Sequence, residues 1–135
     1  MTNETPQRTL GNEQPDPANI VIFGATGDLT KRKLVPALAR MYRARLIHPL
    51  SRIIGVANNM EEDAWFDMVR TALGTFAADL AFTSEEWESF AACLHLVRGD
   101  LSEEATYARV AETLIPLNDR VNVMFYLALK WNGTS

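Results

Sequence analysis

IVIFGATGDLTKRK, residues 20–33, decides the fold that we expect for this chain. Its first four residues form a continuous apolar run, which is typical of a strand buried on both faces of a parallel sheet. Gly24 permits a tight turn after that strand, and Gly27 lets a backbone approach a phosphate group without a side chain in the way. A helical pattern begins directly afterwards. The stretch therefore favours an anion site at a helix N-terminus, although a G-x-x-G pattern alone also fits an ordinary strand–turn–helix junction.

Three cations follow the glycine turn, at Lys31, Arg32 and Lys33. Cations in the first turns of a helix oppose its dipole, at a cost of about 0.3–1 kcal/mol each. Asp28 offsets part of this cost and can cap exposed N–H groups. A bound anion would offset the rest, whereas the alternative is a solvated charged face. We expect the three cations to face an anion.

The rest of the pattern alternates strands with helices. Pro36 lacks an N–H, so either the first helix kinks there or a short turn over residues 29–33 precedes the helix proper. The hydroxyl of Ser84 is the expected cap of the third helix. We expect strands over 20–23, 52–57, 94–97 and 121–129, and helices over 29–47, 61–78, 84–92 and 102–115.

This alternation requires crossover connections and predicts an α/β fold, a Rossmann-type doubly wound parallel sheet. The fourth strand is expected beside the first, with an unpaired far side, so that the sheet is incomplete at its C-terminal edge. The length of 135 residues fits one domain. We expect a flexible leader over residues 1–18, the domain over 19–129 and an atypical tail over 130–135.

Composition excludes several classes of function. The net charge of -4 and the absence of like-charge blocks give no footprint for nucleic acid. No apolar stretch approaches the ~20 residues of a membrane span, and no signal peptide is evident, so we expect a cytoplasmic protein. Cys93 is the only cysteine, which we interpret as a small buried hydrophobe, and no metal-ligand cluster is apparent.

Other polar and aromatic residues have ordinary structural interpretations. The aromatic residues of the second helix are expected in the core, and Tyr107 partly buried. Asp100 is expected to cap a turn after the third strand. His48 is interpreted as a surface or cap residue and His95 as a packed or edge residue. The aromatic residues of the second helix are Trp65, Phe66 and Phe76.

Residues 24–36 resemble the nucleotide-binding segment of the glucose-6-phosphate dehydrogenase family. That family's pattern is glycine-x-x-glycine-Asp-Leu, then a basic run, then a proline three residues after the last lysine. The resemblance continues in residues 53–57, similar to the family's second strand, and in residues 122–129, close to its fourth. It covers residues 19–129.

The resemblance implies hydride transfer from C1 of glucose 6-phosphate to NADP, or in some members NAD, giving 6-phosphogluconolactone in the pentose phosphate pathway. Lys33 matches the last lysine of the motif and would orient the sugar phosphate, while Asn58 would lie at the adenosine end of the coenzyme. The other implied coenzyme-binding residues are Gly24, Ala25, Thr26, Gly27, Asp28, Leu29, Thr30 and Lys31.

This sequence departs from the family in three places. Asn58 stands where the family usually carries the arginine that pairs with the 2′-phosphate of NADP. Glu61 and Glu62 lie too far beyond the end of the second strand to match a carboxylate that binds the ribose of NAD. NADP is therefore favoured as the coenzyme, but NAD stays open. Residues 130–135 replace the family's proline pair. No residue matches the family's catalytic histidine, and loss of a general base costs about 10²–10⁴ in rate. We therefore expect no catalytic residue and little turnover in this chain alone.

Three alternatives remain open at this stage. A non-catalytic nucleotide-sensing or partner-binding module would cover its open sheet edge by association, for example as a homo-oligomer. A short-chain reductase or nucleotide-sugar epimerase would share a G-x-x-G-x-x-G turn, but the third position here is Thr30. A gene remnant would have no stable fold.

Overall fold

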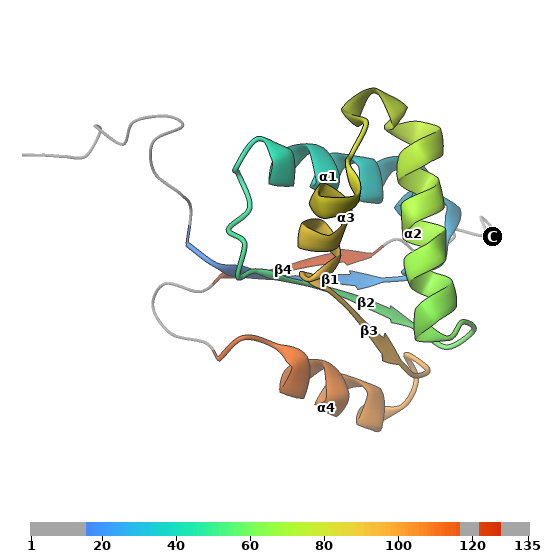
Figure 1. Ribbon diagram of the computed structural model, residues 1–135. Coiled ribbons are helices and arrows are strands. Elements are labelled where there is room, and N and C mark those ends of the chain that lie inside the picture. The colour runs from blue at the N-terminus through green and yellow to red at the C-terminus, as the bar shows by residue number, and fades with distance from the viewer. Residues whose placement is uncertain (1–15, 117–121, 128–135) are drawn as a thin grey trace, which may run out of the picture.

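The computed structural model describes residues 16–116 and 122–127. Its sheet contains β1 (Ala18–Phe23), β2 (Arg52–Ala57), β3 (Leu94–Arg98) and β4 (Asn122–Leu127). The strands pair in parallel in the order β3-β2-β1-β4 (Figure 1). This confirms the predicted α/β fold, with the fourth strand beside the first. Among the described strands, β4 has no second neighbour.

The helices cover both faces of the sheet unequally. A π-helical turn, Thr30–Leu34, leads directly into α1 (Val35–Arg43). Next come α2 (Glu62–Phe76), a 3-10 turn over Ala78–Leu80, and α3 (Ser84–Ala91). These lie on one face, whereas α4 (Glu104–Thr113) lies on the other (Figure 1).

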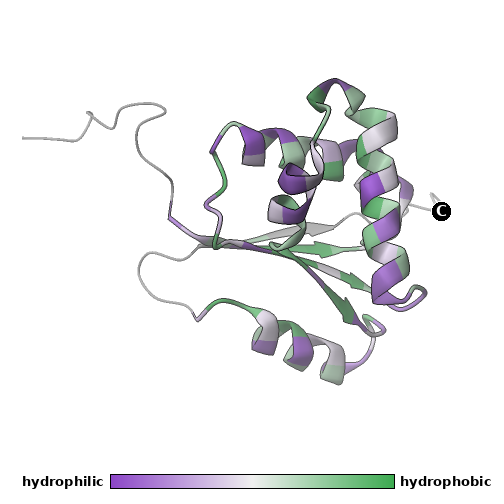
Figure 2. Ribbon diagram, viewed as in Figure 1, coloured by the Kyte–Doolittle hydropathy of each residue, from purple (hydrophilic) through white to green (hydrophobic). Residues whose placement is uncertain are grey.

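Each face of the sheet has its own apolar core, because successive side chains of a strand point to opposite faces. Ile20 and Ile22 pack with α1, α2 and α3, where Trp65 and Phe90 are the largest buried side chains. The α4 core is smaller; it contains Val21, Phe23, Ile54, Val56, Val97 and Val110. Figure 2 shows the resulting apolar strands, with the polar helix residues gathered on the outer surfaces.

The first helical segment accommodates Pro36 by changing its winding. The N–H of Val35 donates to the carbonyl of Thr30, five residues back, and Pro36 lies in the first turn of α1. Proline is tolerated there because the N–H groups of a first helical turn need no intrahelical partner. The interpretation of a short turn before the helix proper is the one that the structure bears out, over residues 30–34.

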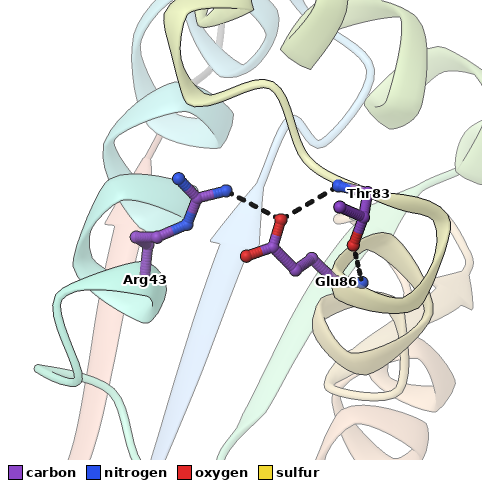
Figure 3. A network of polar contacts seen from close by, with 3 residues as sticks. All are labelled: Arg43, Thr83 and Glu86. Atoms are coloured by element: carbon purple, nitrogen blue, oxygen red, sulfur yellow. Dashed lines mark hydrogen bonds and ion pairs between the residues drawn. The ribbon is translucent and has the colours of Figure 1, made fainter.

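Thr83, not Ser84, caps α3. Its hydroxyl accepts a hydrogen bond from the Glu86 N–H at 3.0 Å, and the Glu86 carboxylate accepts one from the Thr83 N–H at 2.9 Å (Figure 3). The same carboxylate binds the Arg43 guanidinium of α1 at 3.0 Å. The expected cap was one residue late, because both residues carry a hydroxyl and only the observed register places Glu86 at the third helical position.

Two aromatic side chains are more exposed than expected. Phe76 is 38% exposed at the end of α2, where the Arg32 guanidinium lies 5.3 Å from its ring centre, so its assignment to the core was wrong. Tyr107 is 47% exposed and donates from its hydroxyl to the carbonyl of Leu101. Both rings lie at the ends of helices, which the spacing of apolar residues does not reveal.

Cys93 is buried, as expected, and burial raises the pKa of its thiol. This favours the neutral thiol, in keeping with its interpretation as a small hydrophobe. Of the helices in the described ranges, none has both the length and the apolar character needed to cross a bilayer.

Candidate functional site

The glycine turn after β1 wraps over the end of β2. Gly24 has a φ of 86°, in the left-handed region that favours glycine. The N–H groups of Gly24 and Ala25 both donate to the carbonyl of Val56 at 3.2 Å, and the Gly27 N–H donates back to the Gly24 carbonyl at 3.1 Å. The buried Thr30 hydroxyl donates to that carbonyl too, at 2.9 Å. The turn is thus held from both sides by hydrogen bonds.

A helical segment opens directly after this turn. Lys31 donates its N–H to the Gly27 carbonyl at 3.2 Å. The N–H groups of Asp28, Leu29 and Thr30 make no hydrogen bond with another residue of the described ranges. Unpaired N–H groups at the start of a helix are the usual ligands of phosphate groups. The sequence-predicted residues 24–31 therefore come together in one turn, with three open N–H donors at the start of its helix.

Within that turn, Ala25 and Thr30 serve the backbone rather than presenting a side chain. Ala25 is fully buried, and its carbonyl accepts a hydrogen bond from the Trp65 indole at 3.0 Å. Trp65 is itself 1% exposed, so this bond joins α2 to the turn within the core. Sequence reasoning placed Trp65 in the core but missed this contact, because nothing in the spacing of α2 indicates which carbonyl its indole will meet.

The three cations do not act as one group. Arg32 pairs with Asp28 at 3.0 Å and lies over the ring of Phe76, so Asp28 holds a neighbouring cation instead of capping the helix. Lys31 is half-buried and Lys33 exposed, and neither forms an ion pair with another described residue. Lys31 and Lys33 are thus the cations still open to an external anion.

A cleft of about 300 Å³ opens beside the turn, at the carboxyl ends of the first three strands. The hydroxyl of Thr26 lies 3.0 Å from the Oδ1 of Asn59, which joins the turn to the loop after β2. Asn59 was not among the predicted site residues, although it follows Asn58 directly. Carboxyl ends of parallel strands are where this class of fold binds its ligands. The lining residues are Gly24, Thr26, Val56, Ala57, Asn58, Asn59, Gly99, Asp100 and Leu101.

The acidic groups near this cleft already have partners. One carboxylate oxygen of Asp100 accepts hydrogen bonds from the N–H and the hydroxyl of Ser102, at 2.9 and 2.8 Å. These bonds hold the pKa of Asp100 below its ordinary value, so the group is ionised, and they confirm its role as a turn cap. Glu61, directly before α2, pairs with Arg98 at 3.0 Å.

Neither histidine lines the cleft. His48 accepts a hydrogen bond on its Nδ1 from the Leu50 N–H at 2.9 Å, within the turn over residues 48–51. It does not cap the first helix, because α1 ends at Arg43, short of the expected end at residue 47. His95 lies half-buried on the edge strand β3, and burial lowers its pKa. In the described ranges, no three His, Cys, Asp or Glu side chains are grouped in a way that could hold a metal ion.

Comparison with known proteins agrees with this geometry. The family model described as "Glucose-6-phosphate dehydrogenase, NAD binding domain" matches residues 21–133. The chain is 33% identical over 109 residues to the glucose-6-phosphate 1-dehydrogenase of Dickeya dadantii, covering 80% of this chain and 22% of the relative. It is 39% identical over 100 residues to that of Mycolicibacterium smegmatis, covering 73% and 20%. The chain therefore spans about a fifth of the length of these curated relatives.

Solved structures give the same result. The glucose-6-phosphate 1-dehydrogenase of Mycobacterium avium matches with a TM-score of 0.69 and 28% identity, over 87% of this chain and 24% of that one. A glucose-6-phosphate dehydrogenase in complex with glucose 6-phosphate matches with a TM-score of 0.66 and 27% identity, over 87% of this chain and 25% of that one. From the family match, the glycine turn and the strand order together, this chain belongs to the NAD-binding domain family of glucose-6-phosphate dehydrogenases.

Proposed function

We propose that this chain is the coenzyme-binding part of a glucose-6-phosphate 1-dehydrogenase, in which hydride passes from C1 of glucose 6-phosphate to NADP. The observation that carries the proposal is the array of N–H groups of Asp28, Leu29 and Thr30, which no other described residue pairs with. It opens beside a left-handed glycine turn and next to the cleft at the carboxyl ends of the strands. This arrangement fits a pyrophosphate, because the backbone donors and the helix dipole act on the same anion.

The residues present fit a dinucleotide along the whole cleft. Residues 24–31 would hold the pyrophosphate, with Lys31 supplying charge to the turn. Asn58 and Asn59 line the cleft where the adenosine half would lie, at the end of β2. The bound coenzyme supplies the hydride acceptor, and this chain's own residues bind and orient it.

Lys33 has a separate role in the proposal. It is exposed, forms no ion pair with another described residue, and follows the turn by six positions. We assign it to the phosphate of the sugar substrate, whose binding also requires residues beyond the four strands described. A polypeptide of these 135 residues alone is expected to bind coenzyme and to turn over little or no glucose 6-phosphate.

Calorimetric titration of the purified 135-residue chain with NADP and with NAD tests the proposal. Saturable binding of NADP is expected. Lys31→Gln should raise the dissociation constants for both NADP and NAD about tenfold, because both coenzymes carry the pyrophosphate. Hydrogen bonds to charged groups are worth about 1.5–3 kcal/mol. Arg40→Gln is the matched control. Arg40 forms an ion pair with Asp79 and does not line the cleft, so this variant should bind like the unsubstituted chain. A folded chain that binds neither coenzyme at millimolar concentration would contradict the proposal.

A further inference from the structure

Arg98 ends β3, directly before Gly99, which lines the cleft. Its strand partner across the sheet is Ala57, the residue directly before Asn58. Its guanidinium extends to the carboxylate of Glu61, 3.0 Å away, and thus reaches the far end of the loop that carries Asn58 and Asn59. The Arg98 side chain is 51% exposed, so solvent and ligands have access to it.

A second guanidinium reaches the same strand end from the opposite layer. Arg109 of α4 donates to the backbone carbonyl of Arg98. It also lies so close to Gly99 that a Cβ there would collide with it. Gly99 lines the cleft, so the two arginines flank this part of its wall. Their charges add at the end of β3.

The acidic groups at this rim are unsuited to an unphosphorylated ribose. NAD selection normally uses a free carboxylate that accepts hydrogen bonds from the ribose hydroxyls. Here Asp100 is bound by Ser102, and Glu61 comes four residues after the end of β2, late for a carboxylate at the strand end. Arg98, whose side chain pairs within the described ranges with an exposed carboxylate alone, is instead suited to a phosphate. An exposed ion pair contributes about 0–1 kcal/mol to stability, so a phosphate dianion can displace Glu61 from Arg98 at little cost. The guanidinium can then bind the phosphate with two parallel hydrogen bonds.

We propose that Arg98 binds the 2′-phosphate of NADP and is the residue that sets the coenzyme preference of this chain. It supplies from the third strand the charge that Asn58 lacks after the second. Glu61 is its counter-ion in the absence of coenzyme and releases it when the phosphate arrives. The inference rests on the proposed function, since it assumes that the dinucleotide occupies the cleft.

Calorimetric titration of four folded chains with NADP and with NAD tests the assignment. Arg98→Ala should raise the dissociation constant for NADP tenfold or more and change that for NAD less than twofold, because only NADP carries the 2′-phosphate. Glu61→Gln should tighten NADP binding two- to fivefold by removing the competing carboxylate, with NAD again unchanged. Arg40→Ala removes a comparable exposed ion-paired arginine away from the cleft and should change neither constant.

The pattern across the two coenzymes separates the possible failures. Equal weakening of NADP and NAD by Arg98→Ala would overturn the assignment, as would NADP binding that is unaffected by it. If the unsubstituted chain binds neither coenzyme, the proposed function itself fails and the assignment fails with it. If it binds both and only the Arg98 variant loses the distinction between them, the assignment stands.

Discussion

At Gly55 a single methyl group would disturb the contact that holds the glycine turn. A Cβ there would lie 2.6 Å from Cζ2 of Trp65 and 2.7 Å from Cβ of Ala25, both in the buried core. Because neither neighbour can move freely, Gly55→Ala should lower the free energy of unfolding by about 1–3 kcal/mol, the usual cost of overpacking. Urea unfolding followed by circular dichroism would measure the loss.

Gly74 provides the matched control for Gly55→Ala. It lies exposed in α2, and a Cβ there meets nothing within 4 Å. Gly74→Ala should therefore raise the free energy of unfolding by about 0.5–1 kcal/mol, because alanine restricts the unfolded chain and suits a helix. Equal effects of the two substitutions would show that the contact of Trp65 with Ala25 does not constrain Gly55.

Residues within the motif were predictable from sequence, whereas those that support it from elsewhere were not. The positive φ of Gly24 and the open N–H groups after it follow from local chemistry that the motif itself encodes. Trp65 and Asn59 reach the turn from positions 40 and 33 residues away along the chain. Such contacts depend on how the second helix and the loop before it settle on the sheet, and one sequence contains no signal for that.

At the scale of elements, the cap of α3 distinguishes the structure from the sequence-based expectation. Thr83→Ala removes the hydroxyl that accepts the Glu86 N–H and should cost about 1 kcal/mol of stability. Ser84→Ala should cost much less, because Ser84 is exposed in the first turn and alanine is the better helix former. Thermal and urea unfolding of both variants would measure the difference. A larger loss of stability for Ser84→Ala than for Thr83→Ala would show that Ser84 is the cap, as the sequence predicted.

The order of elements was predictable, and their ends were less so. Four apolar runs separated by helical patterns admit few topologies once crossovers must be right-handed, and the observed strand order is one of these. The second helix ends at Phe76 and the fourth at Thr113, both short of the expected ends. Periodicity extends an expected helix as long as apolar spacing continues, whereas the real ends depend on contacts with the layers beneath. The expected leader over residues 1–18 and the tail over 130–135 lie almost entirely outside the described residues and stay predictions.

The molecule as a whole consists of two helical layers on one sheet, with cores of unequal size. In the layer of α1, α2 and α3, the helix α2 by itself has four buried residues, including Trp65 and Val69. In the opposite layer, the buried residues of α4 are Thr106 and Val110. We expect the amides of α4 to exchange with solvent through a local opening that costs less free energy than global unfolding. The amides of β1 and β2, paired inside the sheet, should exchange only on global unfolding. Native-state hydrogen exchange in low denaturant would resolve the two classes.

Val69→Ala and Val110→Ala test this division, because the same methyl groups are removed from buried positions in opposite layers. Each should cost about 1–3 kcal/mol. Val69 stays packed when α4 opens, so Val69→Ala should lower the protection of β1 but leave the opening of α4 unchanged. Val110 loses its contacts in both the local and the global reaction, so Val110→Ala should lower the protection of both. A single protection free energy for α4 and β1, shifted equally by both substitutions, would show that the two layers unfold as one unit.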